Sequence, residues 1–490
     1  MNTNNLTILG IGISEHKCDG VLRFEHFCQA HQLEYQIVGD GQVWRGGDMA
    51  MGPGGGQKIN QLVSVIKDMD NRLIIVCDTF DLYPVAGPTE IIRKFNKLCK
   101  PNQVLFSAEV FCWPDKSLAS MYPAVNTKYK YLNSGCIMGY RNDIYQLITN
   151  STSTINSDNI INDNDDDQLF FTRKFLNGIK LNHIQSNHIQ SNHISIVLDY
   201  KCELFQALNG AIDDVVLFKN RVYNKYTNTY PVFIHGNGPA KAKLNYLENY
   251  IESNILAEPI IADSLTKVDS ALPQQQHIFM ALYIDSSEDS QLKIFMDHIV
   301  KLDYSTINIT IHIYDRCINE YDYDKLINSF LKLFPNINIV YHWNIFGYVF
   351  TDFKKAPYDY YFLVEQRCII TNQHIIQDLI NLCDVHHRII SPLLASTTNP
   401  LFTNFWGALD SNGYYDRSID YKNLINYVYR GLWNVPYVSG VVLFDKSIIL
   451  NWNLDNNLQN IDIDMNLCKQ LRSNTLFMYM SNIDMYGYLC

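Results

Sequence analysis

Arg72-Leu-Ile-Ile-Val-Cys-Asp-Thr-Phe-Asp-Leu-Tyr83 is the stretch that decides the fold. Residues 73–77 are apolar without polar alternation, which is typical of a strand buried on both faces of a parallel sheet. The apolar run ends at Asp78, and a second carboxylate follows at Asp81. Open α/β sheets bind ligands at the carboxyl ends of their strands, and carboxylate oxygens there suit Mg²⁺ or Mn²⁺ on a diphosphate. The stretch therefore predicts an α/β fold with a candidate metal-diphosphate site, although a strand-end aspartate can also be a helix cap or a solvated loop acid.

Strand and helix patterns alternate on both sides of this stretch. A strand over 6–14 ends in small residues, and a helix over 21–32 and a strand over 33–38 follow it. Downstream, the pattern predicts a helix over 88–98 and a strand over 104–109. This alternation is typical of βαβ units.

The second half of the chain repeats the pattern. It predicts strands over 277–284, 307–313 and 337–341, and the run 360–364 is similar to the central strand. That run continues as Glu365-Gln-Arg367 instead of a pair of aspartates, and an arginine in place of a metal-site acid would repel a divalent cation. We therefore expect a duplicated fold whose second copy has lost the metal site.

The chain has 490 residues, which is more than a single hydrophobic core usually organises. Residues 256–276 contain two prolines, small polar residues and three consecutive glutamines. This composition predicts a linker between a catalytic domain over 1–255 and an accessory domain over 277–490 without a metal site.

Two further segments of the first half are candidates for binding a nucleotide and its metal. The run Gly52-Pro-Gly-Gly-Gly-Gln-Lys58 precedes a helix, so its backbone N–H groups and Lys58 could face phosphate, or it could be a flexible loop. It lacks the spacing of a Walker loop. His235 ends a short strand beside glycines, which makes it a reasonable ligand for Mn²⁺.

Three other segments allow both a functional and a plain structural interpretation. Residues 111–114, Phe-Cys-Trp-Pro, could stack on a sugar ring or belong to the core. The aspartates of 163–167 precede a helix, where capping and solvation explain one or two of them but explain the run of three less easily. The pentad repeat of 182–195 places His183, His188 and His193 five residues apart, a spacing that fits neither a helix nor a strand, and we interpret it as a surface loop rather than a metal site.

Composition limits the partners of the chain. With 47% hydrophobic residues and a formal net charge of -11, it is expected to be a globular protein without a basic surface for nucleic acid or anionic membranes. We expect no membrane span. The amino terminus has no basic region and no apolar run of signal-peptide length, so a cytoplasmic location is the default expectation and the compartment stays open.

Seven motifs of the first half resemble, in the same order, the amino-terminal glycosyltransferase domain of the multifunctional procollagen lysyl hydroxylase and glycosyltransferase family. They are Trp44-Arg-Gly-Gly-Asp48, Gly54-Gly-Gly-Gln-Lys58, Asp78-Thr-Phe-Asp81, Phe106-Ser-Ala-Glu-Val-Phe-Cys-Trp-Pro114, Leu132-Asn-Ser-Gly135, Asp165-Asp-Asp-Gln-Leu-Phe170 and His235-Gly-Asn-Gly-Pro-Ala-Lys241. The second half is similar to the accessory domain of the same family through Ser391-Pro-Leu-Leu394, Asn404-Phe-Trp-Gly-Ala-Leu409 and Trp433-Asn-Val-Pro-Tyr437.

The resemblance implies two tandem GT-A, Rossmann-like glycosyltransferase domains, of which the second is degenerate. It implies a Mn²⁺-dependent, retaining transfer of glucose from UDP-glucose to galactosyl-hydroxylysine in collagen-like chains. Family members continue into a dioxygenase domain, for which no residues follow Cys490, so lysyl hydroxylation is not expected. Two alternatives stay open: a UDP-galactose:hydroxylysine galactosyltransferase, and a non-catalytic collagen-binding protein.

The resemblance also implies roles for single residues. Asp78, Asp81 and His235 would hold Mn²⁺, and Asp166 and Asp167 would orient the glucose, one of them as nucleophile or as stabiliser of the reacting centre. The UDP-sugar would be lined by Trp44, Asp48, Lys58, Asp78, Thr79, Phe80, Gly236, Gly238, Pro239, Ala240 and Lys241, with Phe80 on the uracil where the family has tyrosine. The acceptor would face Glu109, Trp113 and Asn133.

Overall fold

The computed structural model describes residues 6–48, 52–150, 160–184, 194–218, 221–251, 276–285, 289–305, 307–316, 332, 334, 337–342, 345, 347–455 and 462–490. The chain divides into two compact units, Met1–Leu247 and Glu248–Cys490, which we call the first and the second unit. The linker expected over 256–276 lies outside the described residues except for Gln276.

The first unit is built on a six-stranded sheet of order β2-β1-β3-β6-β5-β7. The central run predicted from sequence is β3, which is parallel to β1 and antiparallel to β6. The sheet is therefore mixed, whereas the apolar run predicted a parallel one, because burial on both faces makes a strand apolar whatever the direction of its neighbours. The strands are β1 (Leu6–Ser14), β2 (Tyr35–Asp40), β3 (Leu73–Asp78), β5 (Gln103–Glu109), β6 (Tyr131–Tyr140) and β7 (Ser195–Leu198).

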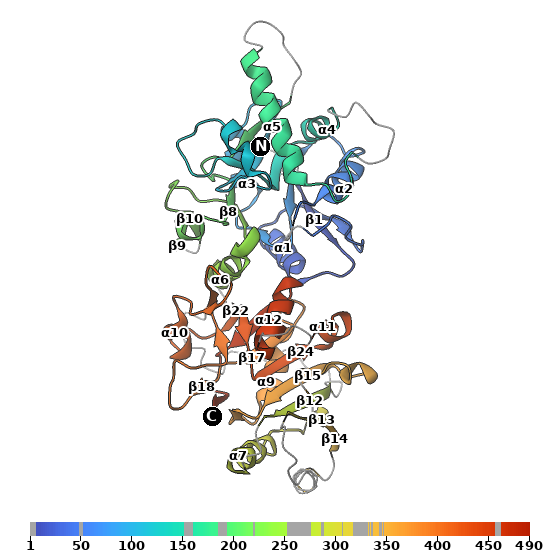
Figure 1. Cartoon of the computed structure of the whole chain (residues 1–490), viewed down its shortest axis with the longest axis vertical. Coiled ribbons are helices and arrows are strands. Elements are labelled where there is room, and N and C mark those ends of the chain that lie inside the picture. Colours follow the sequence, from blue (N-terminus) through green and yellow to red (C-terminus); the bar gives the residue numbers. More distant parts are fainter. Residues whose placement is uncertain are drawn as a thin grey trace. The chain divides into compact units, whose positions relative to one another are not determined.

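Helices cover both faces of this sheet. On one face, α2 (Gly56–Ile66), α4 (Arg141–Thr149) and α5 (Asp167–Ile184) pack through apolar residues such as Leu62, Ile144 and Phe171. In Figure 1, α2 and α4 lie side by side in this unit. On the other face, α1 (Asp19–Ala30) and α3 (Pro88–Leu98) contribute Phe24 and Phe95. This three-layer arrangement explains why β3 carries apolar side chains at every position.

A small second sheet brings two distant parts of the first unit together. Strand β11 (Phe233–His235) lies between β4 (Leu82–Pro84), to which it is antiparallel, and β8 (Phe205–Ala207). In this register His235 lies opposite Leu82, the residue after Asp81. Other elements of this part of the chain include β9 (Val215–Phe218), β10 (Arg221–Asn224) and α6 (Lys241–Ile251).

The second unit repeats the sheet of the first. Its order is β14-β13-β12-β15-β24-β17-β25-β22, and the segment from β13 to β25 matches the order β2-β1-β3-β6-β5-β7. The pair directions also agree, being parallel, parallel, antiparallel, antiparallel and parallel in both units. Strand β15 thus takes the place of β3, as the sequence predicted. The strands are β12 (Gln276–Ile284), β13 (Ile307–Asp315), β14 (Asn338–His342), β15 (Tyr360–Glu365), β17 (Ile389–Pro392), β22 (Leu432–Val435), β24 (Val441–Asp445) and β25 (Met478–Ser481).

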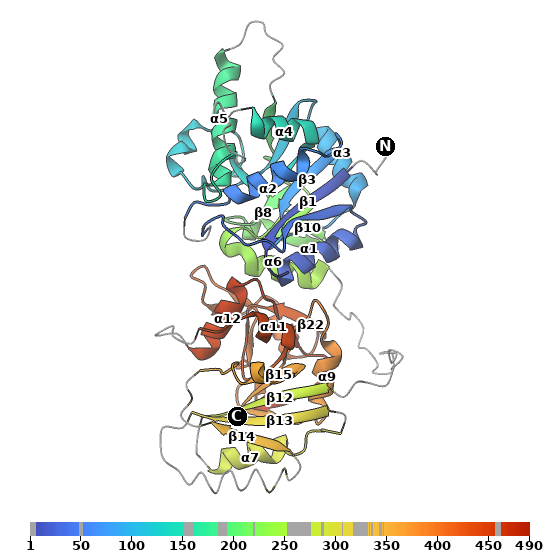
Figure 2. The same ribbon diagram turned by 90° about the vertical axis from the view of Figure 1, so that its right-hand side faces the viewer.

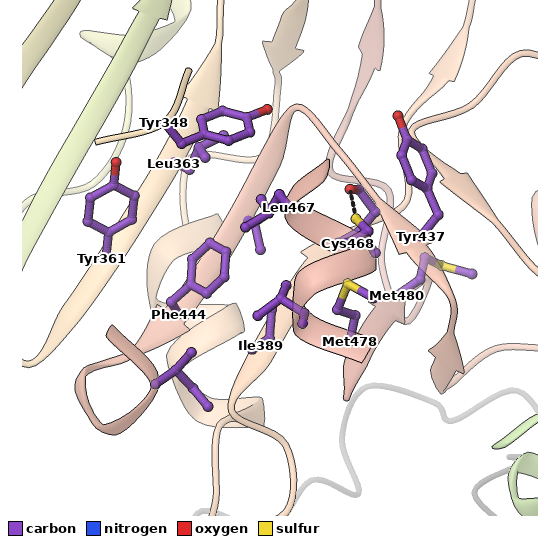
Figure 3. Close-up of a cluster of buried hydrophobic side chains, with 14 of the residues drawn as sticks. Tyr348, Tyr361, Leu363, Ile389, Tyr437, Phe444, Leu467, Cys468, Met478 and Met480 are labelled. Atoms are coloured by element: carbon purple, nitrogen blue, oxygen red, sulfur yellow. Dashed lines mark hydrogen bonds between the residues drawn. The ribbon is translucent and has the colours of Figure 1, made fainter. Parts of the chain in front are cut away.

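Figure 2 shows β15, β12, β13 and β14 in succession in the second unit. One face of the sheet is covered by α7 (Asp289–Ile299) and α9 (Ile375–Leu382), the other by α11 (Lys446–Asn451) and α12 (Ile463–Ser473). Helix α12 is anchored through Leu467 and Cys468, which pack above Ile389 and Met478 in Figure 3. Shorter elements are β16 (Cys368–Ile370), β18 (Ala395–Ser396), β19 (Phe405–Trp406), β20 (Ala408–Leu409), β21 (Tyr415–Asp416), α10 (Tyr421–Ile425), β23 (Tyr437–Val438) and β26 (Gly487–Leu489).

No helix among the described residues is both long enough and apolar enough to cross a bilayer.

Candidate functional site

Two carboxylates and one imidazole converge at the carboxyl end of β3. Asp78 is the last residue of the strand, Asp81 lies in the turn to β4, and His235 ends β11. His235 Nε2 is 3.4 Å from Asp81 Oδ1 and 3.9 Å from Asp78 Oδ2, and the three ligand atoms lie within 4.8 Å of one another. The structure therefore brings together the three residues for which the sequence predicted a metal site.

Two lysines border this cluster and occupy the other oxygen of each carboxylate. Lys58 Nζ, on α2, is 2.6 Å from Asp78 Oδ1, and Lys241 Nζ is 3.5 Å from Asp81 Oδ2. The oxygens that face His235 are Asp78 Oδ2 and Asp81 Oδ1. Each carboxylate thus directs one oxygen to a lysine and the other to a shared point beside the imidazole.

The cluster fits a divalent cation. Two atoms that each lie about 2.1 Å from one ion are at most about 4.2 Å apart, and both distances from His235 Nε2 are shorter than that. Carboxylate oxygens suit Mn²⁺ or Mg²⁺, and imidazole is a common additional ligand. His235 Nδ1 is buried without a hydrogen-bond partner among the described residues, so the ring orientation is not explained by a second hydrogen bond of its own.

Electrostatics favour the charged forms of Asp81 and His235. Burial raises the pKa of Asp81, but the nearby Lys241, His235 and Lys58 lower it overall to well below its usual range. Burial lowers the pKa of His235, but the hydrogen bond and charge of Asp81, together with Asp78, raise it overall. A cation bound to Nε2 would take the place of the proton that these carboxylates favour.

Gly135 on β6 leaves the space that the His235 ring occupies. A Cβ at this position would lie 2.3 Å from Cε1 and 2.7 Å from Nδ1 of the ring. Those distances are far below van der Waals contact, so only glycine allows the imidazole to face Asp78 and Asp81.

We expect Gly135→Ala to weaken Mn²⁺ binding about 10- to 100-fold, because the added methyl displaces His235 without removing any ligand. Isothermal titration with Mn²⁺ measures the effect. Gly178→Ala is the matched control, since a Cβ there, on α5, meets no atom within 4 Å. A folded Gly135→Ala variant that binds Mn²⁺ like the wild type would contradict the importance of this ring position.

The glycine turn before α2 holds an acidic loop in place. Gly56 N donates to Asp165 O at 2.7 Å, Gln57 N donates to Asp163 O at 2.9 Å, and Asp167 N donates to Gly54 O at 3.1 Å. The prediction that these N–H groups face phosphate is therefore wrong for Gly56 and Gln57, because loop carbonyls already accept from them. The turn is also not a free loop, since it is clamped to the residues that begin α5.

The two aspartates at the start of α5 have different surroundings. Asp166 Oδ1 accepts from Leu169 N at 2.6 Å, which is a helix-capping bond. Asp167 is buried; its Oδ2 accepts from the Ser134 hydroxyl at 3.1 Å and lies 4.0 Å from Lys58 Nζ. Burial raises the pKa of Asp167 to about 6, with Lys58 opposing the shift and Asp78 and Asp166 adding to it. The structure thus places Asp167, rather than Asp166, beside the lysine that contacts the cluster.

Glu109 is the centre of a buried amide network. Its Oε1 accepts from Gln168 Nε2 at 2.8 Å and from Asn133 Nδ2 at 3.2 Å, and its Oε2 accepts from Asn237 Nδ2 at 3.0 Å. Burial raises the pKa of Glu109. Because Glu109 is 3% exposed and saturated with amides, it holds Asn133 in position rather than offering its own oxygens at the surface. Trp113, at 46% exposure, does offer its ring.

Gln168, Asn237 and Ser134 are members of this site that the sequence analysis did not select. Each is a residue inside one of the quoted motifs, and that membership is the signal that the sequence offers. Ser134 links the network to Asp167, and Gln168 Nε2 also donates to the carbonyl of Trp113 at 3.2 Å.

The other residues predicted to line a nucleotide differ in burial and in their hydrogen bonds. Thr79 is buried and its hydroxyl donates to Ile11 O at 2.9 Å, and Gly236 N donates to Asp81 O at 2.8 Å. Trp44 Nε1 donates to Gly47 O at 2.7 Å. Asp48 is exposed and directly precedes residues 49–51, which the structure does not describe. Phe80 is partly exposed, Gly238 and Pro239 are exposed in the turn after β11, and Ala240 is buried.

In the second unit, an arginine lies at the strand end that corresponds to the Asp78, Asp81 and His235 cluster of the first unit. Arg367 Nε is 2.9 Å from Glu365 Oε2, and one of its terminal nitrogens is 2.9 Å from Asp464 Oδ2. Glu365 ends β15 as Asp78 ends β3, and Asp464 lies in the first turn of α12 as Asp167 does in α5. The guanidinium charge therefore already neutralises the acids that a metal would need.

A second group of possible metal ligands lies elsewhere in the second unit. His312 Nδ1 and His342 Nε2 are 2.9 Å apart, and His342 Nε2 is 3.5 Å from Asp352 Oδ2. The two imidazoles share a hydrogen bond, and Lys355 Nζ already pairs with Asp352 at 2.5 Å, so we interpret this group as a hydrogen-bond network. Of the pentad-repeat histidines, His188 and His193 lie outside the described residues, as does the His183 side chain.

Two family models match the chain. The model described as the PLOD GT domain matches residues 2–261, and the model of the glycosyltransferase family 25 N-terminal domain matches residues 349–490. Together with the repeated strand order, they make the chain an α/β protein of two tandem glycosyltransferase-like domains, as the sequence predicted.

Relatives match nearly the whole chain. An uncharacterized protein of Acanthamoeba polyphaga mimivirus is 48% identical over 100% of this chain and 99% of its own length. The human procollagen-lysine,2-oxoglutarate 5-dioxygenase 2 is 32% identical over 98% of this chain. The multifunctional procollagen lysine hydroxylase and glycosyltransferase of Caenorhabditis elegans is 31% identical over 98% of this chain. The chain spans 65% of the length of each of these two animal proteins.

Solved structures give a more distant likeness. A crystal structure of GalNAc-T7 with UDP, GalNAc and Mn²⁺ is 10% identical, with a TM-score of 0.34 over 44% of either chain. A mannosyltransferase from Pyrobaculum calidifontis in complex with GDP-Man and Mn²⁺ is 10% identical, with a TM-score of 0.28 over 43% of this chain and 53% of that one. These TM-scores are too low to support an argument. The fold assignment therefore relies on the strand order and on the family models. The PLOD GT model matches more than half of the residues of this chain, and the matched range includes Asp78, Asp81 and His235. The chain therefore belongs to the glycosyltransferase family of the procollagen lysyl hydroxylases.

Proposed function

We propose that the first unit is a Mn²⁺-dependent, retaining glycosyltransferase that moves glucose from UDP-glucose to galactosyl-hydroxylysine in collagen-like chains. The observation that carries the proposal is the convergence of Asp78, Asp81 and His235 at a strand end, within a domain of this family. The resemblance to the family supplies the donor and the acceptor, and the names of the animal relatives supply the link to collagen.

In this proposal Asp78, Asp81 and His235 hold the cation against the diphosphate. When bound, Mn²⁺ would neutralise the charge that grows on the diphosphate as the sugar leaves. Lys58 and Lys241 add positive charge at the same edge, and each already sits within 3.5 Å of a cluster carboxylate. Phe80 would stack on the uracil, and the turn from Gly236 to Lys241 would enclose the nucleotide.

Asp167 would act on the sugar. It is buried, it is fixed by Ser134, and its carboxylate form prevails at neutral pH, because its pKa is raised only to about 6. A carboxylate held in this way can orient the glucose hydroxyls and stabilise positive charge at the anomeric carbon. Asp166 would act beside it, although its Oδ1 is occupied by helix capping.

The acceptor sugar would stack on the exposed ring of Trp113, next to Asn133. Glu109 would hold the Asn133 amide and the Gln168 amide in fixed orientations. Such fixed groups place an acceptor hydroxyl for attack without ordering new side chains during the reaction.

We expect the chain to bind one Mn²⁺ ion tightly, at Asp78, Asp81 and His235. Arg367 neutralises the corresponding acids of the second unit, and the imidazole pair of His312 and His342 is a poorer match for Mn²⁺ than for softer metals. Isothermal titration of EDTA-treated protein gives the stoichiometry. Two tight Mn²⁺ ions per chain would contradict the assignment of Arg367.

The proposed donor is tested by UDP release with UDP-glucose and with UDP-galactose, each with Mn²⁺ and a collagen peptide that carries galactosyl-hydroxylysine. We expect release with UDP-glucose only, and its loss when EDTA removes the metal. Faster release with UDP-galactose would overturn the donor assignment but keep the metal site.

A further inference from the structure

The second unit contains a cavity beside the arginine that replaces the metal cluster. Its volume is about 250 Å³. It is lined by Arg367 and Asp464, together with residues of the segments 402–415 and 437–439. The hollow beside Lys58 in the first unit offers only about 20 Å³. The cavity of the second unit is partly open to solvent, and its volume is many times the roughly 10 to 15 Å³ that one water needs. The second unit therefore has a space large enough for a small ligand beside Arg367, where it lacks the carboxylate and imidazole cluster of the first unit.

Four of the ten residues that line this cavity are aromatic, namely Phe402, Trp406, Tyr415 and Tyr437. Tyr415 and Tyr437 lie with ring centroids 4.4 Å apart, and the half-buried Trp406 stacks on Tyr421 with an interplanar angle of 19°. Phe402 is 50% exposed and borders the same space. Aromatic faces of this kind pack well against the C–H face of a sugar ring, because their negative π-surface meets weakly positive hydrogens.

The polar groups of the cavity are fixed before any ligand arrives. Tyr437 OH donates to Asp464 Oδ2 at 3.4 Å, and Arg472 donates to Tyr415 OH at 3.2 Å. In Figure 3 the hydroxyl of Tyr437 points away from the methionines of β25. Asp464 belongs to α12, which is anchored in the core by Leu467. A site prepared in this way loses little entropy when it binds a ligand.

The charges of the cavity select against a nucleotide. Asp462 and Asp464 line it, and the only lining cation among the described residues, Arg367, is already paired with Glu365 and Asp464. A diphosphate would therefore meet the Asp462 carboxylate, with no metal to bridge the two and with the charge of Arg367 already used by Glu365 and Asp464. Neutral hydroxyl groups, in contrast, can donate to the Asp462 carboxylate.

We propose that this cavity is a second carbohydrate-binding site, which takes one neutral hexose residue of a glycan without metal and without nucleotide. The hexose packs its C–H face on Trp406 and donates a hydroxyl to Asp462, because Asp464 already accepts from Arg367 and Tyr437. This site goes beyond the transfer reaction of the first unit, and it can exist whether or not that reaction is the proposed one.

The test uses the full chain in EDTA without UDP, so that the donor site of the first unit has neither metal nor nucleotide. The probes are methyl β-galactoside, methyl β-glucoside and UDP, and binding is followed by saturation-transfer NMR and titration calorimetry. We expect millimolar binding of at least one methyl glycoside and no binding of UDP. Binding of UDP that depends on Arg367, or no binding of either glycoside, would overturn the proposal.

Two variants assign the binding to this cavity. Trp406→Ala should weaken glycoside binding about tenfold or more, whereas Tyr414→Ala, at a neighbouring residue that is 63% exposed and does not line the cavity, should leave it unchanged. Asp462→Asn keeps the capping of α12 and removes one carboxylate, so it tests the site even if Trp406→Ala fails to fold. Glycoside binding that is unchanged in a folded Trp406→Ala or Asp462→Asn protein would place the sugar elsewhere.

Discussion

Replacing Asp81 by asparagine is expected to lower kcat/KM of the Mn²⁺-dependent transfer about 10³-fold while the chain stays folded. Asp81 contributes an oxygen that faces His235 Nε2 at 3.4 Å, and its other oxygen is 3.5 Å from Lys241 Nζ. Metal ions supply several kcal/mol of charge stabilisation in such reactions, and each 1.36 kcal/mol is tenfold in rate. Asparagine keeps the shape but provides no charge for the cation.

The fold should tolerate this change because Asp81 acts through its side chain at the edge of the sheet, while its backbone carbonyl still accepts from Gly236 N. Turnover, Mn²⁺ affinity and thermal melting are measured together on the variant. Asp68→Asn, at an exposed position of the same unit, is the control and should behave like wild type. Wild-type turnover in a normally melting Asp81→Asn protein would remove Asp81 from the metal site.

The second large effect is expected at Asp167. We expect Asp167→Asn to lower kcat about 10²- to 10³-fold with little change in Mn²⁺ affinity. The carboxylate is buried, accepts from Ser134 and lies 4.0 Å from Lys58 Nζ, so asparagine removes a charge from the reacting side without removing a metal ligand. A fall in kcat without a parallel rise in KM would indicate an interaction made in the transition state.

Asp165→Asn is the matched control for Asp167→Asn. Asp165 is an exposed neighbour whose carboxylate accepts from the backbone and the side chain of Asn162, which asparagine can also do through its carbonyl oxygen. It should retain kcat within about twofold, since exposed substitutions away from special features are close to neutral. If both variants lost activity equally, the effect would belong to the loop as a whole and not to the Asp167 carboxylate.

Asp78 and Asp81 could be located from sequence alone because open α/β sheets bind ligands at the carboxyl ends of their strands. A buried apolar run that stops at an acid marks the edge of a sheet, wherever the other strands come from. His235 could be selected for the same reason, because it ends a short strand beside glycines. The contact between His235 and Asp81, however, depends on the pairing of β11 with β4, which no local pattern encodes.

The buried amides could not be found in this way. Gln168 and Asn237 are ordinary polar residues in the sequence, and their role follows only from the packing that turns both toward Glu109. The structure of the glycine turn before α2 could not be predicted for a similar reason. Gly54 and Gly56 bond to the acidic loop at 163–167, and that partner comes from a distant part of the chain. The sequence also could not predict that β6 is antiparallel to β3, because a strand covered on both faces is apolar in either orientation.

The most direct test of the account is the mass of the product formed from UDP-glucose and Mn²⁺ on two otherwise identical collagen peptides, one with hydroxylysine and one with galactosyl-hydroxylysine. The account predicts that one hexose is added to the galactosylated peptide only, and that Asp81→Asn abolishes the addition. Hexose added to the bare hydroxylysine peptide, or no addition to either peptide by a protein that binds Mn²⁺, would contradict it.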